Sequence, residues 1–106
     1  MAKYLAIASY TTDGLRELAA HGASARIEAS KKLLAEAGGS VESFYYAFGS
    51  DDVYIVCDMP DNVAAAGAAI AAGASGMVVT RMVPLLTADE IDEAVSRNLR
   101  LAGPGR

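Results

Sequence analysis

The chain has 106 residues, a formal net charge of −4 and 53% hydrophobic residues. This length predicts a single domain, residues 1–106, with one modest core. The nine Lys and Arg residues are scattered along the chain, which argues against nucleic acid as a partner. The longest stretch without a charge, residues 62–80, is rich in alanine and interrupted by glycines. It therefore predicts no membrane span and no membrane partner.

Much of the apolar content is in small side chains, because 22 residues are alanine. Alanine lets backbones approach closely but fills little volume, so we expect a loose core and an association between copies of the chain. The predicted partner is therefore the chain itself, in a homo-oligomer that is at least a dimer. The single cysteine, Cys57, cannot form an intrachain disulfide, and no charged-then-apolar leader opens the sequence. The expected compartment is the cytoplasm.

The first elements are a strand and a helix. Residues 3–10 contain enough β-forming residues in an alternating pattern to predict a strand. Thr11, Thr12 and Asp13 offer N-cap oxygens, so a helix is predicted to start there. Its apolar spacing is interrupted near His21-Gly22, which predicts two helical segments hinged at that point.

The next elements are two strands. Gly38-Gly39 ends the preceding helix, and residues 41–48 and 52–58 are predicted to form a hairpin across a short turn at 49–51. These two strands decide the predicted architecture, because they place a hairpin between the helices that precede and follow them.

The remaining elements are a helix, a strand and a last helix. Eight of the twelve residues from 63 to 74 are alanine, in a predicted helix. Residues 77–86 follow as the fourth strand. Thr87 and Glu90 match a capping box, so a further helix is predicted to about Leu99. Residues 99–106 are expected to form a frayed tail.

The predicted order is β-α-β-β-α-β followed by an extra C-terminal helix. This order is typical of the α+β ferredoxin-like fold, in which a four-stranded antiparallel sheet carries two helices on one face. We assigned alternate residues of the first and third strands to the two faces of this sheet. The residues expected to face the helices are Leu5, Ile7, Val53, Ile55 and Cys57. Those expected on the other face, which should be covered by something, are Tyr4, Ala6, Ala8, Tyr10, Tyr54 and Val56.

From Lys3 to Ala94 the chain resembles the GYD domain family of small bacterial and archaeal proteins. The stretches that carry the resemblance are Tyr4 to Tyr10, Gly39 to Gly49 with its Glu-Ser-Phe-Tyr-Tyr-Ala-Phe core, the strand after Asp52, Pro60 to Ala65, Ala74-Ser75-Gly76 and Pro84 to Thr87. The family is named for a Gly, a Tyr and an Asp in the hairpin turn. Here Gly49 and Asp52 enclose Ser50 and Asp51 without a tyrosine. Whatever a turn tyrosine does in relatives cannot be transferred to this chain.

The resemblance implies an association of the dimeric α/β-barrel type and leaves the molecular function open. Two functions remain. The first is a small oligomeric module for ligand binding or assembly. The alternative is a cofactor-free isomerase or oxygenase-type enzyme of the dimeric α/β-barrel group, acting on a small, partly apolar molecule between the sheet and the first helix. No nucleophile is paired with a base in the sequence, which favours the first.

Two residues of the first helical region are candidates for chemistry. His21, the single imidazole, is the weak catalytic candidate as a general base; equally, its charged form suits the end of a helix. Arg26 is a candidate for holding an anionic ligand, and a solvated arginine is the simpler interpretation.

Tyr10, Tyr45 and Tyr54 are the other ligand-binding candidates. Their hydroxyls could orient a polar ligand, although tyrosine also suits half-buried sheet positions. The acidic residues Asp51, Asp52 and Asp58 are too widely spaced along the predicted hairpin to share one ion, so no metal site is predicted. No phosphate-binding loop is present either, and no cofactor is expected.

Overall fold

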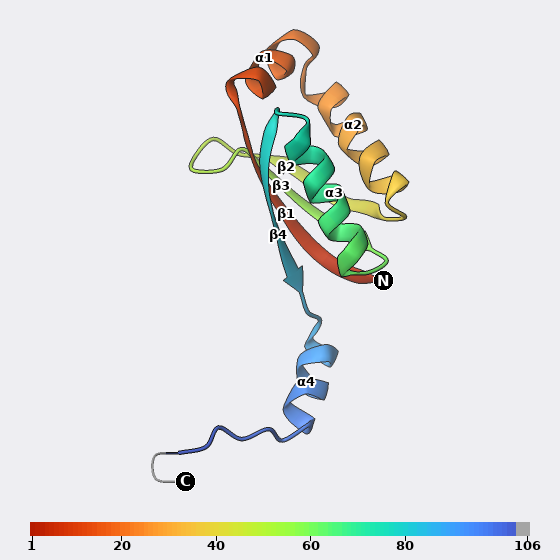
Figure 1. Cartoon of the computed structure of the whole chain (residues 1–106), viewed down its shortest axis with the longest axis vertical. Helices are drawn as coiled ribbons and strands as arrows, with labels where there is room; N and C mark the ends of the chain where they lie inside the picture. The colour runs from red at the N-terminus through yellow and green to blue at the C-terminus, as the bar shows by residue number, and fades with distance from the viewer. Residues whose placement is uncertain (104–106) are drawn as a thin grey trace.

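Four strands and four helices make up the described part of the chain, residues 1–103 of a computed structural model (Figure 1). In chain order they are β1 (Ala2–Tyr10), α1 (Thr12–His21), α2 (Ala23–Glu36), β2 (Ser40–Tyr46), β3 (Val53–Met59), α3 (Asn62–Ala74), β4 (Val78–Leu85) and α4 (Ala88–Ser96).

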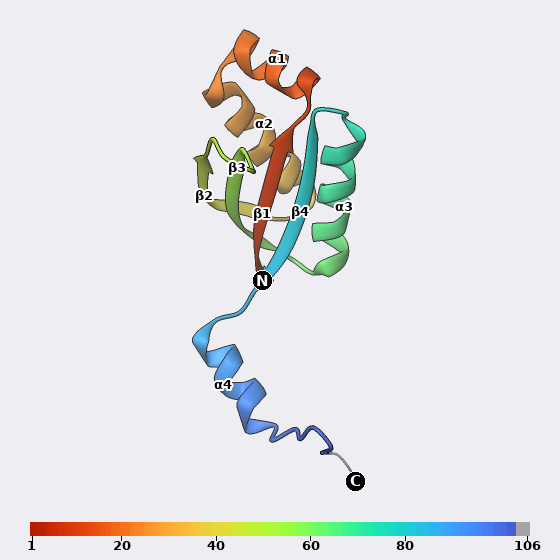
Figure 2. The ribbon, with the colours of Figure 1, turned by 90° about the vertical axis from the view of Figure 1, so that its left-hand side faces the viewer.

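The strands form one antiparallel sheet in the order β2-β3-β1-β4. The two middle strands are β1 and β3, which is the arrangement that a βαββαβ chain with two crossover helices produces. Helices α2 and α3 both lie on one face of the sheet, and Figure 2 looks onto the other face. The predicted α+β ferredoxin-like fold with a four-stranded antiparallel sheet is therefore confirmed. We call the side away from α2 and α3 the open face.

The predicted assignment of the β1 residues to the two faces of the sheet is wrong. Tyr4, Ala6 and Ala8 are buried in the core beneath the helices, and Tyr4 is only 3% exposed. The register explains this, because these three residues pair with Cys57, Ile55 and Val53, which were correctly expected to face the helices. Leu5 and Ile7 pair with Val56 and Tyr54 and therefore lie on the open face.

The reason for this error is that both faces of β1 are apolar. Alternation of hydrophobicity identifies the buried face of a strand only when the other face is polar. The sequence predicts the larger side chains Leu5 and Ile7 on the side of the core. In the structure Ala6 and Ala8 occupy the side that faces the helices. Their small size leaves space between the middle of the sheet and the helices.

The hinge in the first helical region is confirmed. Gly22 ends α1 with φ of 83°, a left-handed value that favours glycine, and α2 begins at the next residue. The side chain of Thr11 caps α1 by accepting a hydrogen bond from the backbone N–H of Gly14 at 3.2 Å. Helix α1 is therefore a short unit at one end of the sheet, and α2 can lie across the sheet independently (Figure 1).

Helix α3 is the alanine-rich helix. The Asp61 carboxylate caps it by accepting a hydrogen bond from the N–H of Ala64 at 2.8 Å, and the Tyr4 hydroxyl donates to the side-chain oxygen of Asn62 at the same end. Ala65 and Ala68 face the sheet and are buried. Helix α3 packs mainly on β4, and to a smaller extent on β3.

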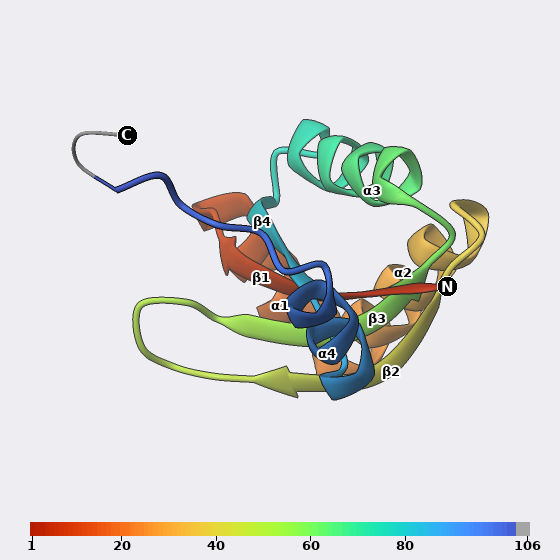
Figure 3. The same ribbon diagram turned by 90° about the horizontal axis from the view of Figure 1, so that it is seen from below.

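The connection between β2 and β3 is longer than the predicted turn at 49–51. It spans residues 47–52 and projects well beyond the strands (Figure 3). Strand β2 also contains an irregularity between Val41 and Ser43, which shifts its alternation.

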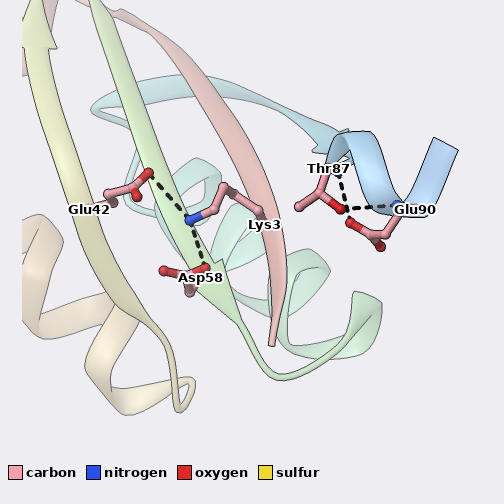
Figure 4. Close-up of polar contacts among 5 residues, drawn as sticks. All are labelled: Lys3, Glu42, Asp58, Thr87 and Glu90. Carbon is pink, nitrogen blue, oxygen red and sulfur yellow. Dashed lines mark hydrogen bonds and ion pairs between the residues drawn. The ribbon is translucent and has the colours of Figure 1, made fainter. Parts of the chain in front are cut away.

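At the opposite end of the sheet from this loop, where β1 begins, the Lys3 ammonium contacts Asp58 at 3.0 Å and Glu42 at 3.3 Å (Figure 4). The hydrogen bond that the Lys3 ammonium donates to Asp58 raises the pKa of Lys3.

The last helix, α4, has the predicted capping box. The Thr87 hydroxyl accepts from the N–H of Glu90 at 3.1 Å, and the Glu90 carboxylate accepts from the N–H of Thr87 at 2.9 Å (Figure 4). The helix ends at Ser96, earlier than expected, and none of its residues is buried. Of the expected tail, residues 99–103 are not helical, and residues 104–106 lie outside the described residues.

Candidate functional site

A pocket of about 180 Å³ lies between the sheet, α2 and α3. We call it the inner pocket. Its wall on the sheet side includes Ala6 and Ala8 of β1, and its wall on the α3 side includes Ala68, Ala69 and Ala72. These side chains separate the layers without filling the space between them. The alanine content that predicted a loose core therefore produces one specific pocket.

The wall of the inner pocket is mainly apolar, with a few polar side chains. They come from β1, α2, the end of α3 and β4, and they are Tyr10, Arg26, Ser30, Ser75 and Thr80. A largely apolar pocket with a few converging polar groups is the common form of a small-molecule site. Arginine is the one side chain among them that carries a charge at neutral pH.

Arg26 lies in the first turns of α2, and its Nε atom is buried without a hydrogen-bond partner within residues 1–103. A guanidinium has five N–H donors in a fixed plane and stays charged. Burying one of these donors without an acceptor is unfavourable, by about 1–3 kcal/mol or more for a charged group. Arg26 therefore has an unused donor beside an apolar pocket.

Two tyrosines lie near Arg26. Tyr10 lines the inner pocket, and the Tyr46 hydroxyl donates to the carbonyl oxygen of Ala23 in the first turn of α2, at 3.2 Å. Burial, together with a hydrogen bond involving Tyr10, raises the pKa of Tyr46 above its ordinary value. The Tyr46 phenol is therefore neutral near pH 7 and holds the start of α2 against the end of β2.

The sequence-predicted ligand residues are divided between the two faces of the sheet. Tyr10 and Arg26 both line the inner pocket. Tyr45 and Tyr54 pair with each other across β2 and β3, on the open face and away from the pocket. The open-face position of Tyr54 agrees with the sequence prediction, whereas Tyr10, which was expected on the same face, lies on the helix side of the sheet.

His21 lies at the last residue of α1, and its Nε2 is 3.3 Å from the Glu17 carboxylate one helical turn earlier. The side chain is exposed, and His21 does not line the inner pocket. This is the helix-terminal position that the simpler interpretation predicted. A role for His21 in catalysis has no support from its position.

Sequence reasoning missed Ser30, Ser75 and Thr80. Thr80 could have been found from the alternation of β4, since it lies between Val78 and Met82 on the same face as both. Ser30 and Ser75 had no comparable signal, because polar residues on helices are usually in solvent. Their role depends on how α2 and the end of α3 approach the sheet.

The other candidates for chemistry are occupied by structural contacts. Asp51 accepts from the Ser9 hydroxyl at 3.1 Å and pairs with Arg81 at 3.2 Å, and Asp52 accepts from the N–H of Tyr10. Within the described residues, no three His, Cys, Asp or Glu side chains form a group that could hold a metal ion. Cys57 is fully buried, and burial raises the pKa of its thiol.

One comparison with known proteins identifies the family of the chain. The family model of the GYD domain matches residues 4–95, which is most of the chain. The chain belongs to the GYD domain family. No curated protein and no solved structure is significantly similar to it.

The loop between β2 and β3 of this GYD domain is fixed through Asp52. Asp52 holds the loop before β3 to the end of β1, through the N–H of Tyr10 at 2.8 Å. The backbone N–H of Asp52 also donates to the carbonyl oxygen of Ala8 at 2.9 Å. The aspartate of this GYD domain therefore has a structural role, and it requires no tyrosine in the loop. Within residues 1–103, no helix combines the length and the hydrophobicity needed to cross a membrane.

Proposed function

We propose that this GYD domain is a small homo-oligomeric ligand-binding protein, and that its ligand is a small, largely apolar acid held in the inner pocket. The acid group would lie at Arg26, and the apolar part would contact the alanines of β1 and α3. The observation that carries the proposal is the buried Nε of Arg26, which has no acceptor within the described residues and lies at an apolar pocket.

A carboxylate is the group that best satisfies Arg26. Its two oxygens match the parallel N–H donors of a guanidinium, and such bidentate pairs are shorter and stronger than neutral hydrogen bonds. The exposed carboxylates on α2 do not take this role: Glu28, for example, pairs with Lys31 at 3.6 Å. A ligand carboxylate would supply the missing acceptor for Nε, and the Tyr10 hydroxyl, which lines the same pocket, can add a further donor.

The size of the pocket limits the rest of the ligand. A dry apolar cavity of about 150 Å³ is large enough to bind benzene. The inner pocket, at about 180 Å³, has room for a single six-membered ring or a short branched chain with one carboxylate. Benzoate is therefore a suitable probe of the ligand class.

Calorimetric titration tests the proposal. Benzoate and benzamide have nearly the same shape, but only benzoate carries a charge. We expect benzoate to bind about 10-fold to 100-fold more tightly, because a charged hydrogen bond contributes about 1.5–3 kcal/mol. Arg26→Met should abolish this preference and keep the apolar stem. The control is Arg16→Met, since Arg16 is exposed on α1 and pairs only weakly with Asp13, at 3.7 Å. Equal binding of both probes by the parent protein would contradict the proposal.

The alternative enzyme, a cofactor-free isomerase or oxygenase-type protein, would use the same pocket. Such chemistry needs a group that accepts or donates a proton beside the substrate. His21 is outside the pocket, so binding has the better support. A panel of small aldehydes, lactones and quinols tests the enzyme. A turnover that is lost in folded Arg26→Met protein, but kept in Arg16→Met protein, would favour it.

We further propose that the functional unit is a homo-oligomer in which a second copy covers the open face. Large apolar side chains on this face support the proposal, because a contiguous apolar surface in water usually marks an interface. Val79 is 66% exposed and Tyr45 is 71% exposed. In an association of the dimeric α/β-barrel type, a second copy of the chain would supply this cover. The buried single thiol is compatible with a reducing compartment, and we propose the cytoplasm as the location.

A further inference from the structure

The C-terminal arm, residues 86–101, stands away from the rest of the molecule. It continues beyond the end of β4, with α4 as its central part, and it gives the molecule its long axis of 60 Å against 29 and 22 Å across (Figures 1 and 2). All of its residues are exposed. Nothing within the described part of the chain packs on it.

Helix α4 is amphipathic. Ile91 and Val95 are four residues apart and therefore lie on one side of the helix, and Leu99 follows in the non-helical segment after Asn98. They are 46%, 73% and 86% exposed. The opposite side carries Asp89 and Glu93. The arm thus presents a narrow apolar stripe, with charged residues on its outer side.

An isolated helix of this length is not stable in water. Nucleation is unfavourable, and helices shorter than about 12–15 residues are marginal even in good sequences. Helix α4 has nine residues and gains about 1 kcal/mol from its capping box, which does not replace tertiary packing. A surface must therefore cover the stripe if the helix is to persist.

The same chain exposes a surface that suits this stripe. The exposed apolar side chains of the open face on β4 are Val79 and Val83, which lie on either side of Arg81, and next to them Leu5 on β1 and Val56 on β3 are partly exposed. Three strands at about 4.8 Å spacing are about 10 Å wide, and Ile91 and Val95 lie about 6 Å apart along the helix. Both apolar side chains of the helix therefore fit within the width of these strands.

We propose that two copies of this chain exchange their arms, so that α4 of each copy lies on the open face of the other. A second copy is the occupant because one arrangement then covers both surfaces, whereas contact between two open faces alone would leave both stripes in water. The sixteen residues of the arm would supply much of the roughly 20–30 residues that each partner contributes to a standard interface. Reciprocal contacts of this kind close under two-fold symmetry.

The direction of the arm favours exchange over folding back. Thr87, the N-cap residue, has extended backbone angles, with φ of −75° and ψ of 164°, and the arm runs on beyond the end of β4 away from its own sheet (Figure 2). To reach its own open face the chain would need to reverse direction beside this residue. The inner pocket lies on the opposite side of the sheet, so the exchange does not depend on the proposed ligand.

Complementation between two variants tests the exchange in the full chain. The arm variant is Ile91→Gln with Val95→Gln, and its control is Glu93→Gln with Ser96→Gln on the outer side of α4. The face variant is Val56→Gln with Val83→Gln, and its control is Lys32→Gln with Glu36→Gln on exposed positions of α2. Molar mass is measured by light scattering and the dimer Kd by sedimentation. Circular dichroism establishes which variants are folded.

We expect a dimer for the parent chain and for both controls. In each pure variant the dimer Kd should rise at least about 100-fold, because four apolar side chains per dimer lose their burial. An equimolar mixture of the two variants should again form a dimer, since one intact arm then meets one intact open face. A monomeric parent chain, an arm variant that still dimerises as tightly as the parent, or a mixture that stays monomeric would each overturn the proposal. If the face variant fails to fold, Val83→Gln alone replaces it.

Discussion

The carboxylate of Asp52 accepts a hydrogen bond from the backbone N–H of Tyr10, with a donor-acceptor distance of 2.8 Å. This bond joins the loop before β3 to the last residue of β1. The side chain of Tyr10 lines the inner pocket. The loop between β2 and β3, residues 47–52, is therefore connected directly to the wall of the inner pocket.

Replacement of Asp52 by alanine should lower the free energy of unfolding by about 1.5 kcal/mol, because the N–H of Tyr10 loses a charged acceptor. Asp52→Asn should lose less, since its amide oxygen can still accept. Urea denaturation measures both variants. Asp92→Ala, at an exposed position of α4, is the control and should match the parent protein. If Asp52→Ala unfolds at the same urea concentration as that control, the bond does not stabilise the fold.

Stability should fall at alkaline pH in a way that depends on Tyr46. Its pKa is raised in the folded state, so the neutral phenol is favoured there. The resulting stabilisation is fully present below the ordinary tyrosine pKa of about 10 and is lost as the pH rises through the raised value. The loss in free energy of unfolding between pH 8 and pH 11 should therefore be smaller in Tyr46→Phe than in the parent protein. Tyr45→Phe, at an exposed position, should keep the parent's dependence, and equal slopes in the two variants would contradict this explanation.

Ala69 lies on the wall of the inner pocket, so a larger side chain there should occupy the space of the ligand. We expect Ala69→Leu to weaken benzoate binding at least about 10-fold while the protein stays folded, because removing ligand-sized space costs most of the apolar contact. Ala66→Leu adds the same side chain at an exposed position of the same helix. Calorimetry on both variants checks the expectation. Equal affinities of the two variants for benzoate would show that the ligand binds outside the inner pocket.

Two glycine substitutions should change stability in opposite directions. A Cβ atom at Gly14 would collide with the backbone carbonyl oxygen of Met77, so Gly14→Ala should destabilise by about 1–3 kcal/mol. At Gly67, in the middle of α3, a Cβ atom meets nothing within 4 Å, and alanine should stabilise the helix by about 0.5–1 kcal/mol. Thermal melts of both variants measure these effects. The same sign for both would show that packing at Gly14 is looser than the structure indicates.

Local signals in the sequence were enough to predict most of the fold. The hinge at Gly22 and the capping box of Thr87 and Glu90 depend on backbone geometry that particular residues favour, so they can be recognised one element at a time. The face of β1 could not be predicted, because Leu5 and Ala6 are both apolar and only pairing with β3 distinguishes them. The isolated position of α4 could not be predicted either, since the sequence of an amphipathic helix does not indicate which surface it covers.

Only part of the candidate site could be predicted, because the sequence does not show which side chains share a surface. Tyr10 and Arg26 were recognised by residue type, and the structure brings them to one pocket. Tyr45 and Tyr54 were recognised by the same criterion and lie on the open face. Residue type identifies possible chemistry, but the alternation of each strand decides which side chains share a surface. The pocket itself depends on which alanines face one another across the layers, and a sequence pattern does not contain that information.

A crystal structure of the protein with 4-bromobenzoate tests the central claim most directly, because the anomalous signal of bromine locates the ligand independently of any assumption about the site. We predict bromine between the alanines of β1 and α3, with the carboxylate within hydrogen-bonding distance, about 3 Å, of the Nε atom of Arg26. Crystals of Arg26→Met grown in the same way should lack this signal. Bromine on the open face, or an inner pocket that stays empty at saturating ligand while calorimetry records binding, would contradict the proposed site.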